Sequence, residues 1–384
     1  MVKNMVGRAG RLGFSEHGTS YLLALTDKEA YDFWSHYVRG VPEDIISRFF
    51  GENTDLRSLV TSVLAATPGD AGLGVDDIVA FLQNSFGAFQ RVQTAPNWLV
   101  DAGAIIAALD DLVRHEMVRS MPDKRYRLDA LGKLAGENRI EVSSITRLVD
   151  AFHSISPESI TEHVLVAAAQ LTLELDQVNF PLNKKGGVKE RQTWMTELQR
   201  QGVPYPLLGL LDSLGTEQHQ GALRAKKTAG CFLWMTDSPL SNIEAILTKH
   251  GGAFNGAAGP LRSVSARTCD LLPTVARVAE ILHPGLNLVD RQARLITRLE
   301  IGIPAEAVEV AQYAGLRLTR GDYRSLLAAN LCGIDQLAQS TDEAVLACIG
   351  GSKMKLDFLW DAIETHRKRI GVDIEGPLLP AYEK

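Results

Sequence analysis

Helical periodicity interrupted by Pro and Gly is the feature that most limits how this chain can fold. Between residues 141 and 282, amphipathic segments follow one another and each ends at helix-breaking residues. From residue 286 to 370 the segments are shorter, with turns at Gly302, Pro304, Gly315 and Gly333. The pattern predicts a mainly α-helical protein. Because 384 residues are too many for one core, we expect several domains.

Residues 55–140 carry a different pattern, in which helical segments are followed by a hairpin. Helices are expected at 55–66, 75–86 and 99–115, and two short alternating runs then flank the turn Pro122-Asp123-Lys124. This outline is typical of a winged helix. Its third helix has few basic residues, which favours a structural spacer over an element that reads a DNA groove.

The N-terminal part differs again. The apolar run TSYLLALT at 19–26 predicts a buried strand at the end of an α/β domain. Residues 30–50 are rich in aromatic and charged side chains and predict a helix and a connector, interrupted near Gly40 and Pro42.

Composition narrows the class of protein. Hydrophobic residues make up 45% and charged residues 22%, as in soluble globular chains. A net charge of -6 argues against coating of nucleic acid over the whole surface but leaves room for a local basic channel. Basic residues cluster at 3–11, 184–191, 224–227 and 366–369.

No apolar run reaches the roughly 18 residues of a bilayer span, and no signal peptide is present, so we expect a cytoplasmic protein without a membrane partner.

Metal, disulfide and hydrolase chemistry find no support in the sequence. Cys231, Cys269, Cys332 and Cys348 form no CxxC pair and predict core thiols. The histidines have no metal-ligand spacing, and no Ser/His/Asp or Cys/His set can be assembled. We therefore expect no metal site and no independent active site.

The run NMVGRAGRLG at 4–13 is the strongest candidate for chemistry. Gly7 and Gly10 would let a ligand approach the backbone closely, and Arg8 and Arg11 could make charge-assisted contacts to phosphate. On residue types alone, a surface loop is an equal alternative. The full string NMVGRAGRLGF, followed by an apolar run, resembles motif VI of superfamily 2 helicases, most closely the superkiller-like DExH branch, with Asn4 where that family has Gln.

This resemblance implies an ATP site. Gly7, Arg8, Gly10 and Arg11 would lie on the second of two RecA-like domains, with Arg11 as the arginine finger and Arg8 as its phosphate-contacting partner. ATP and Mg would be the cofactors of the parent enzyme.

The other ATPase motifs are missing from the chain. GALRAKKT at 221–228 has Lys226 where a Walker A loop needs Gly, and DEAV at 342–345 falls in an expected helix rather than after a strand. We therefore expect the C-terminal part of a larger helicase, either a separate piece or half of a split enzyme. Alone it should bind no cofactor and hydrolyse no ATP.

The order of the segments is similar to that of archaeal fork-repair helicases and the helicase half of polymerase theta. The resemblance implies the tail of the second RecA-like domain at 1–29, a connector at 30–54 and a winged helix at 55–140. A helical ratchet domain at 141–284 and a helix-hairpin-helix-like domain with a tail at 285–384 would follow.

The same resemblance implies 3′ to 5′ movement on single-stranded nucleic acid, with DNA preferred. The partners would be that strand, the missing N-terminal RecA domains and a protein partner. Two alternatives stay open: an RNA helicase of the same branch, and a non-catalytic protein-interaction scaffold.

The segment GAAGPLRSVSARTCDLLPTVARVAEIL at 256–282 is similar to the ratchet helix of these proteins. At helical spacing Arg262, Cys269, Pro273 and Arg277 fall near one face, so we expect Arg262 and Arg277 to contact backbone phosphates. The alternative is an ordinary amphipathic helix with arginines on its wet side. Relatives often have an aromatic residue near the position of Cys269, so electrostatic contact is expected rather than stacking. Pro273 should kink or split the helix.

Two further segments are candidates for phosphate contact. Residues 316–337 stand where the family has its glycine hairpin, but here the turn reads Arg320-Gly321-Asp322. Asp322 would repel phosphate, and Arg320 and Arg324 would compensate. DNA binding and a packing or autoinhibitory role are equal alternatives for this module.

The second segment is a basic loop at 182–194. Lys184 and Lys185 in this loop would touch single strands, against the alternative of a plain solvated loop.

Overall fold

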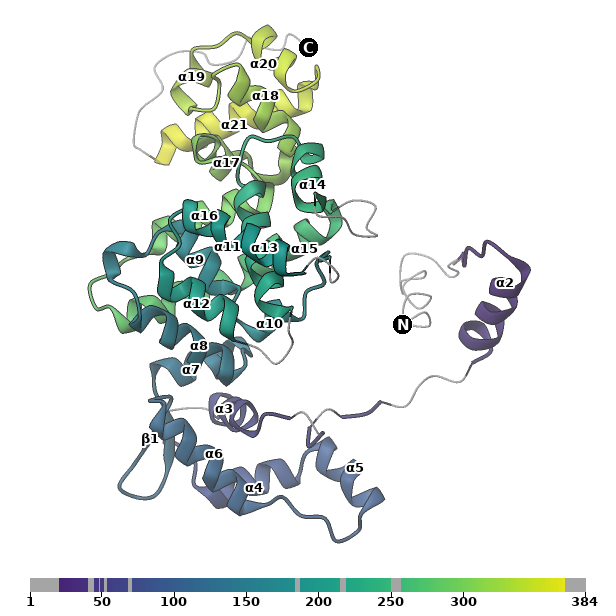
Figure 1. Cartoon of the computed structure of the whole chain (residues 1–384), viewed down its shortest axis with the longest axis vertical. Coiled ribbons are helices and arrows are strands. Elements are labelled where there is room, and N and C mark those ends of the chain that lie inside the picture. Colours follow the sequence, from purple (N-terminus) through teal and green to yellow (C-terminus); the bar gives the residue numbers. More distant parts are fainter. Residues whose placement is uncertain are drawn as a thin grey trace. The chain divides into compact units, whose positions relative to one another are not determined.

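The computed structural model describes residues 21–40, 45–47, 49–51, 54–67, 71–183, 187–214, 219–249 and 257–369. Within these residues the chain is mainly α-helical and has a single antiparallel pair of short strands (Figure 1). The predicted mainly α fold is confirmed. The chain divides into two compact units, residues 1–54 with 80–100 and residues 55–79 with 101–384.

The first unit contains helix α2 (Asp27–Phe33), the π-helix η1 (Trp34–Val38) and α5 (Phe86–Thr94). Thr26 starts α2 by accepting a hydrogen bond from the Glu29 amide. The connector at residues 45–51 is tied to α5, since the Ser47 amide donates to Gln90 and the Gln90 amide group donates to the Ile45 carbonyl, both at 2.7 Å.

The strand predicted at 19–26 is wrong for the part that the structure describes. Residues 21–24 have no regular structure, and α2 begins at Asp27. Tyr21, Leu23 and Leu25 are 84%, 90% and 94% exposed. A strand needs a neighbour for its backbone groups, and the described part of the chain offers none beside this segment.

The second unit opens with the helices and hairpin expected at 55–128. Helix α3 (Leu56–Ala66) starts at the cap Asp55, and α6 (Ala102–Arg114) starts at the cap Asp101. Strands β1 (Val118–Ser120) and β2 (Tyr126–Leu128) pair with Val118 opposite Leu128. These elements lie close to their predicted positions.

One predicted helix of this region is shorter than expected. Helix α4 (Val75–Gln83) ends before the predicted residue 86, because Ser85 accepts from the Ala88 amide and starts the separate helix α5.

Residues 130–301 form a bundle built around one long helix, α15 (Ala258–Leu282). It packs against α7, α8, α9, α13 and α16 and buries Leu261, Val264, Leu271, Leu272 and Val275. The other helices of the bundle are α7 (Ala130–Asn138), α8 (Val142–His153), α9 (Glu162–Ala169), α10 (Leu173–Asp176), α11 (Gly187–Arg200), α12 (Tyr205–Ser213), α13 (Gln220–Trp234), α14 (Leu240–Thr248) and α16 (Val289–Ile301), with the 3-10 turn η2 (Pro157–Ser159).

The basic cluster at 224–227 lies inside this bundle rather than on its surface. Arg224, Lys226 and Lys227 are 1%, 2% and 1% exposed on α13. Arg224 donates to Asp176 at 2.7 and 2.5 Å, and Lys226 contacts Glu190. The same helix contains the string GALRAKKT, which is therefore no phosphate loop.

The C-terminal helices have a hydrophobic core of their own around Tyr323, Leu326, Leu337 and Leu359. They are η4 (Ala305–Ala307), α17 (Val308–Ala314), η5 (Gly315–Arg317), α18 (Arg320–Ala328), α19 (Ile334–Ala338), α20 (Asp342–Cys348) and α21 (Lys353–Arg369). The predicted short helices are confirmed, and DEAV lies within α20.

All four cysteines are free, and Cys231 and Cys332 are buried as expected, whereas Cys269 and Cys348 are partly exposed. In the described part of the chain, no helix is both long enough and apolar enough to cross a bilayer.

Candidate nucleic-acid interface

Helix α15 presents one exposed stripe to solvent while its other sides are buried. The stripe consists of Arg262, Ala266, Asp270, Pro273 and Arg277, spaced three or four residues apart. The prediction that Arg262 and Arg277 share a face agrees with this placement. They are fifteen positions apart, which is about 22 Å along a helix that rises 1.5 Å per residue.

Pro273 does not split this helix. Helix α15 is continuous from Ala258 to Leu282, so a split, one of the two expected outcomes, is wrong. Pro273 removes the amide that would bond to the Cys269 carbonyl. The flanking Leu271, Leu272 and Val275 are buried, and this packing holds the helix together across the missing bond.

The two arginines of the stripe differ in their partners. Arg262 makes no hydrogen bond or ion pair with any residue that the structure describes, and it is exposed. Arg277, with 59% of its side chain exposed, contacts Glu280 at 3.2 Å. A phosphate would therefore reach Arg262 more easily than Arg277, because no carboxylate of the described residues has to be displaced.

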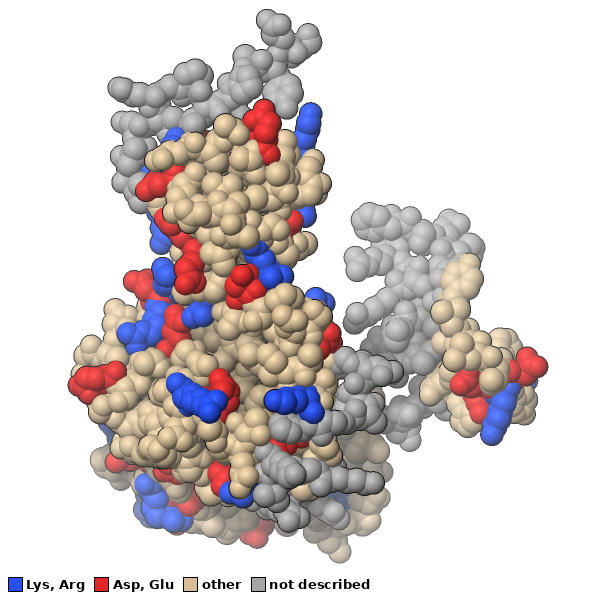
Figure 2. All heavy atoms as spheres, turned by 45° about the horizontal axis from the view of Figure 1, so that its top comes forward, with Lys and Arg blue, Asp and Glu red and all other residues tan. Residues whose placement is uncertain are grey.

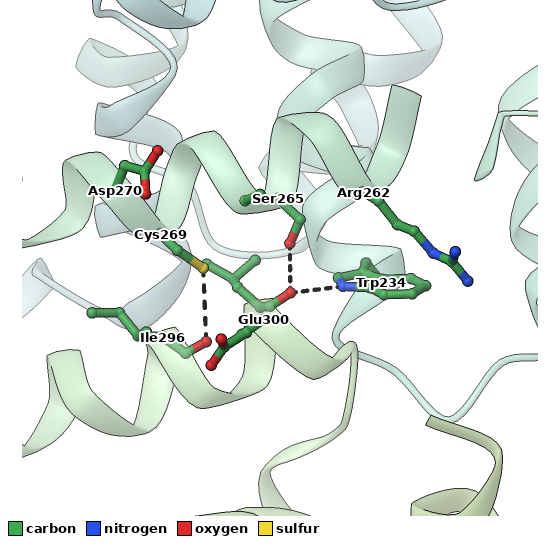
Figure 3. Close-up of a pocket in the computed structure, with 9 residues that line it drawn as sticks. Trp234, Arg262, Ser265, Cys269, Asp270, Ile296 and Glu300 are labelled. Carbon is green, nitrogen blue, oxygen red and sulfur yellow. Dashed lines mark hydrogen bonds between the residues drawn. The ribbon is translucent and has the colours of Figure 1, made fainter. Parts of the chain in front are cut away.

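A pocket of about 340 Å³ opens beside the stripe (Figure 3). Trp234 at the end of α13 and Ile296, Leu299 and Glu300 of α16 form one side of it. Helix α15 contributes Arg262, Ser265, Ala266, Cys269 and Asp270.

Hydrogen bonds hold the walls of this pocket. The Leu299 carbonyl accepts from the Trp234 indole at 2.8 Å and from the Ser265 hydroxyl at 2.6 Å. The Cys269 thiol donates to the Ile296 carbonyl at 3.7 Å, and burial raises its pKa to about 12. Cys269 is thus a protonated wall residue at neutral pH, not a reactive thiol.

Arg320, at the start of α18, packs over the ring of Trp234 and has a structural role. Its guanidinium sits 4.8 Å from the Trp234 ring and donates to the carbonyls of Gly302, Thr236 and Ser238 at 2.5, 2.9 and 2.8 Å. Burial, then the charges of Arg324 and Arg262, lower its pKa to about 10. These contacts join the C-terminal helices to the bundle and leave little of Arg320 for a phosphate.

Comparison with known proteins shows which proteins this chain is similar to. No protein-family model matches the chain. ATP-dependent DNA helicase Hel308 of Caldivirga maquilingensis is 25% identical over 88% of this chain, and that of Thermoplasma acidophilum is 23% identical over 91%. The same protein of Methanocella arvoryzae is 22% identical over 93%. The chain is similar to DNA helicases along most of its length.

The chain spans less than half of these relatives, 43% of the first and 45% of the other two. Among the described residues, the α15 stripe and its pocket are the candidate surface for a nucleic-acid strand. On the face of the second unit that Figure 2 shows, Lys and Arg are interspersed with Asp and Glu rather than gathered in one basic field. Contact with DNA would accordingly be local.

Arg324 and Asp322 were predicted to face a phosphate, but both make contacts within the protein. Arg324 donates to the Asp237 side chain at 2.9 Å and is partly exposed. Asp322 is 7% exposed, accepts from the Thr319 amide and contacts Lys355 at 2.8 Å. Burial alone would raise the pKa of Asp322, but Lys355 and Thr319 bring it below its usual value. Because Lys355 neutralises the carboxylate internally, the expected repulsion of phosphate is weak.

The segment Arg320-Gly321-Asp322 is the first turn of α18 and not a hairpin. Two left-handed glycines occur instead at Gly350 and Gly351, between α20 and α21, with φ of 67° and 73°. A Cβ at either position would meet no atom within 4 Å. The pair Gly350-Gly351, followed by Ser352-Lys353, is the sequence signal for an amide-rich turn, and it lies outside the predicted segment 316–337.

Several predicted site residues lie outside the described residues. They are Gly7, Arg8, Gly10 and Arg11 of the motif VI-like run and Lys184 and Lys185 of the basic loop. The pocket residues Trp234 and Glu300 had no sequence signal, because they lie on two helices, α13 and α16, that are far apart in the sequence.

Proposed function

We propose that this chain is the strand-guiding part of an ATP-dependent DNA helicase that moves 3′ to 5′ on single-stranded DNA. In this proposal the bundle at 141–284 is the ratchet domain and α15 is its ratchet helix. Residues 55–140 act as a winged-helix spacer, and residues 285–384 act as a helix-hairpin-helix-like module. The relatives are named DNA helicases, which supports DNA over RNA as the substrate. A cytoplasmic location goes with this function.

The observation that carries the proposal is the α15 stripe, in a chain similar to DNA helicases. Arg262 offers a guanidinium without a partner among the described residues, and Arg277, which is paired with Glu280, offers a second guanidinium about 22 Å away along the helix. Asp270, between them, repels phosphate, so the strand would be held at the two ends of the stripe and not at its middle. Such an arrangement binds a backbone without reading its sequence.

The motif VI-like run would contribute to the ATP site of the helicase. Arg8 and Arg11 would reach ATP and Mg held by RecA-like domains, and would stabilise the charge that develops during phosphoryl transfer. Because this sequence holds neither a Walker A loop nor a DExx motif, the purified chain should show no Mg-dependent ATPase. Appreciable turnover by the pure chain would contradict this part of the proposal.

Fluorescence anisotropy of a labelled single-stranded DNA tests the strand contact. Titrations at two salt concentrations compare the native chain with the double variant Arg262→Ala/Arg277→Ala. Arg294→Ala is the matched control, since Arg294 is an exposed arginine of α16 that lies off the stripe. We expect salt-sensitive binding that the double variant loses and the control keeps. RNA and duplex DNA of equal length should bind more weakly.

One observation favours a second function, a protein-interaction scaffold. The first unit has a groove of about 850 Å³ lined by Ile45, Ile46, Phe49, Phe86 and Phe89. Ile45 and Ile46 are 80% and 79% exposed, and Phe86 and Phe89 stack on each other at 6.3 Å. Exposed apolar patches of this kind mark protein contacts. If salt leaves all nucleic-acid binding unchanged, or no strand binds, the scaffold is the better interpretation.

A further inference from the structure

The pocket beside α15 could bind a chemical group other than phosphate. Its volume of about 340 Å³ lies within the range of small-ligand sites, roughly 300–1,000 Å³. Ala266, Ile296 and Leu299 give it apolar walls. A planar heterocycle would fit such walls, whereas a hydrated ion would not.

The charges of the pocket are separated along its length. In Figure 3 the guanidinium of Arg262 extends past Trp234 at one end, while the carboxylates of Glu300 and Asp270 lie toward the other. Asp270 is held by Arg267 at 3.4 Å. Glu300 is exposed and, like Arg262, has no hydrogen bond or ion pair among the residues with described positions. Among the described residues, an unpaired cation and an unpaired carboxylate thus flank an apolar space.

A nucleotide has the complementary arrangement of groups. Its phosphate is anionic, its base is planar, and adenine, cytosine and guanine carry an exocyclic amino group that donates to a carboxylate. Thymine has only one ring N–H, between two carbonyl oxygens that repel a carboxylate. A strand phosphate on Arg262 would bring the attached base to the mouth of the pocket.

We propose that the α15 pocket receives one base of the bound single strand and prefers an amino-bearing base to thymine through Glu300. The inference rests on the proposed strand contact at α15. It adds a selectivity to a helix that otherwise holds only the backbone. Cys269 leaves the space open, because its small side chain turns to the Ile296 carbonyl.

A variant that fills the pocket tests whether a base of the strand enters it. Ala266 is exposed on the stripe and lines the pocket, so Ala266→Phe occupies the space without disturbing the buried face of α15. Ser263→Phe adds the same ring to an exposed position of α15 that does not line the pocket. Circular dichroism and thermal melting verify that both variants fold. Anisotropy then gives the affinity for oligo-dC and oligo-dT of equal length.

We expect the native chain to bind oligo-dC about fivefold more tightly than oligo-dT. Ala266→Phe should remove this preference by weakening oligo-dC binding, while Ser263→Phe should keep it. Glu300→Gln should reduce the preference toward unity by tightening oligo-dT binding, since Gln presents both a donor and an acceptor and no longer repels the thymine carbonyl oxygens.

Other outcomes distinguish a failure of the base pocket from a failure of the strand contact. Equal affinity of the native chain for both oligonucleotides, or a preference that survives Ala266→Phe, would overturn the base pocket. If binding is nevertheless salt-sensitive and lost in Arg262→Ala/Arg277→Ala, the strand contact stands alone. If neither oligonucleotide binds, the proposed function itself fails.

Discussion

Helices α13 and α15 both carry several cations, yet the two helices use them in opposite ways. On α13, Arg224, Lys226 and Lys227 are buried and held by Asp176, Glu190 and the Leu175 carbonyl. On α15, Arg262 and Arg277 stand on an exposed stripe, and only Arg277 has a described partner. The run RAKK is the denser basic cluster in the sequence, but the widely spaced Arg262 and Arg277 are the cations exposed to solvent. Charge density along a chain therefore does not locate a nucleic-acid surface until the burial of each cation is known.

The largest expected effect comes from breaking a buried ion pair of α13. Asp176→Asn would leave Arg224 buried without its counter-charge and would also remove the contact to Arg147 at 3.2 Å. We expect a loss of about 3–5 kcal/mol in the free energy of unfolding, measured by urea denaturation. Asp270→Asn is the surface counterpart, because Asp270 and Arg267 are 64% and 41% exposed, and it should cost under about 1 kcal/mol. Similar losses in both variants would contradict the expected difference between the buried ion pair of α13 and the exposed ion pair of α15.

A second test uses the pH dependence of Lys227. Burial lowers the pKa of Lys227 from 10.5 to about 8. Between these values the unfolded chain binds more protons than the folded chain, so the contribution of Lys227 to stability increases as the pH rises from about 8 to 10.5. The full gain is about 3 kcal/mol at most.

Lys227→Met should remove this rise, so the stability of the native chain minus that of the variant should grow with pH over the window. The difference is needed because burial also raises the pKa of Cys231 to about 12, and this thiol lowers stability above pH 9 in both proteins. A difference that stays flat with pH would show that Lys227 keeps an ordinary pKa.

Periodicity and punctuation in the sequence were sufficient to predict the helical fold and the shared face of Arg262 and Arg277. They could not predict where a polar side chain finds its partner. Arg320 is bound by the carbonyls of Thr236, Ser238 and Gly302, and backbone acceptors distant in sequence leave no pattern to recognise. The strand at 19–26 failed for a related reason, since apolar composition indicates burial only when a neighbouring element exists to provide it.

Removing Arg262 should affect DNA binding without affecting stability, the reverse of the α13 variants. Because its guanidinium has no described partner to lose, Arg262→Ala should leave the urea midpoint unchanged. Loss of one charged phosphate contact should weaken single-strand binding about tenfold. The slope of log affinity against log salt should fall by about 0.7. Normal DNA binding by this variant would contradict the proposed contact between the strand and α15.

Arg277 provides the smallest and sharpest test, because it differs from Arg262 mainly in being paired. Glu280 contacts Arg277 at 3.2 Å and also accepts from the Leu288 amide at 2.9 Å, so it stays in place when a strand arrives. A phosphate must compete with that carboxylate, and Arg277→Ala should therefore weaken binding only about threefold at low salt. Glu280→Gln should free Arg277 and tighten binding by a similar factor, at some cost in stability from the weaker hydrogen bond to Leu288. If Arg277→Ala is instead as damaging as Arg262→Ala, pairing within the helix does not govern access to phosphate, and exposure alone decides which cations of α15 bind DNA.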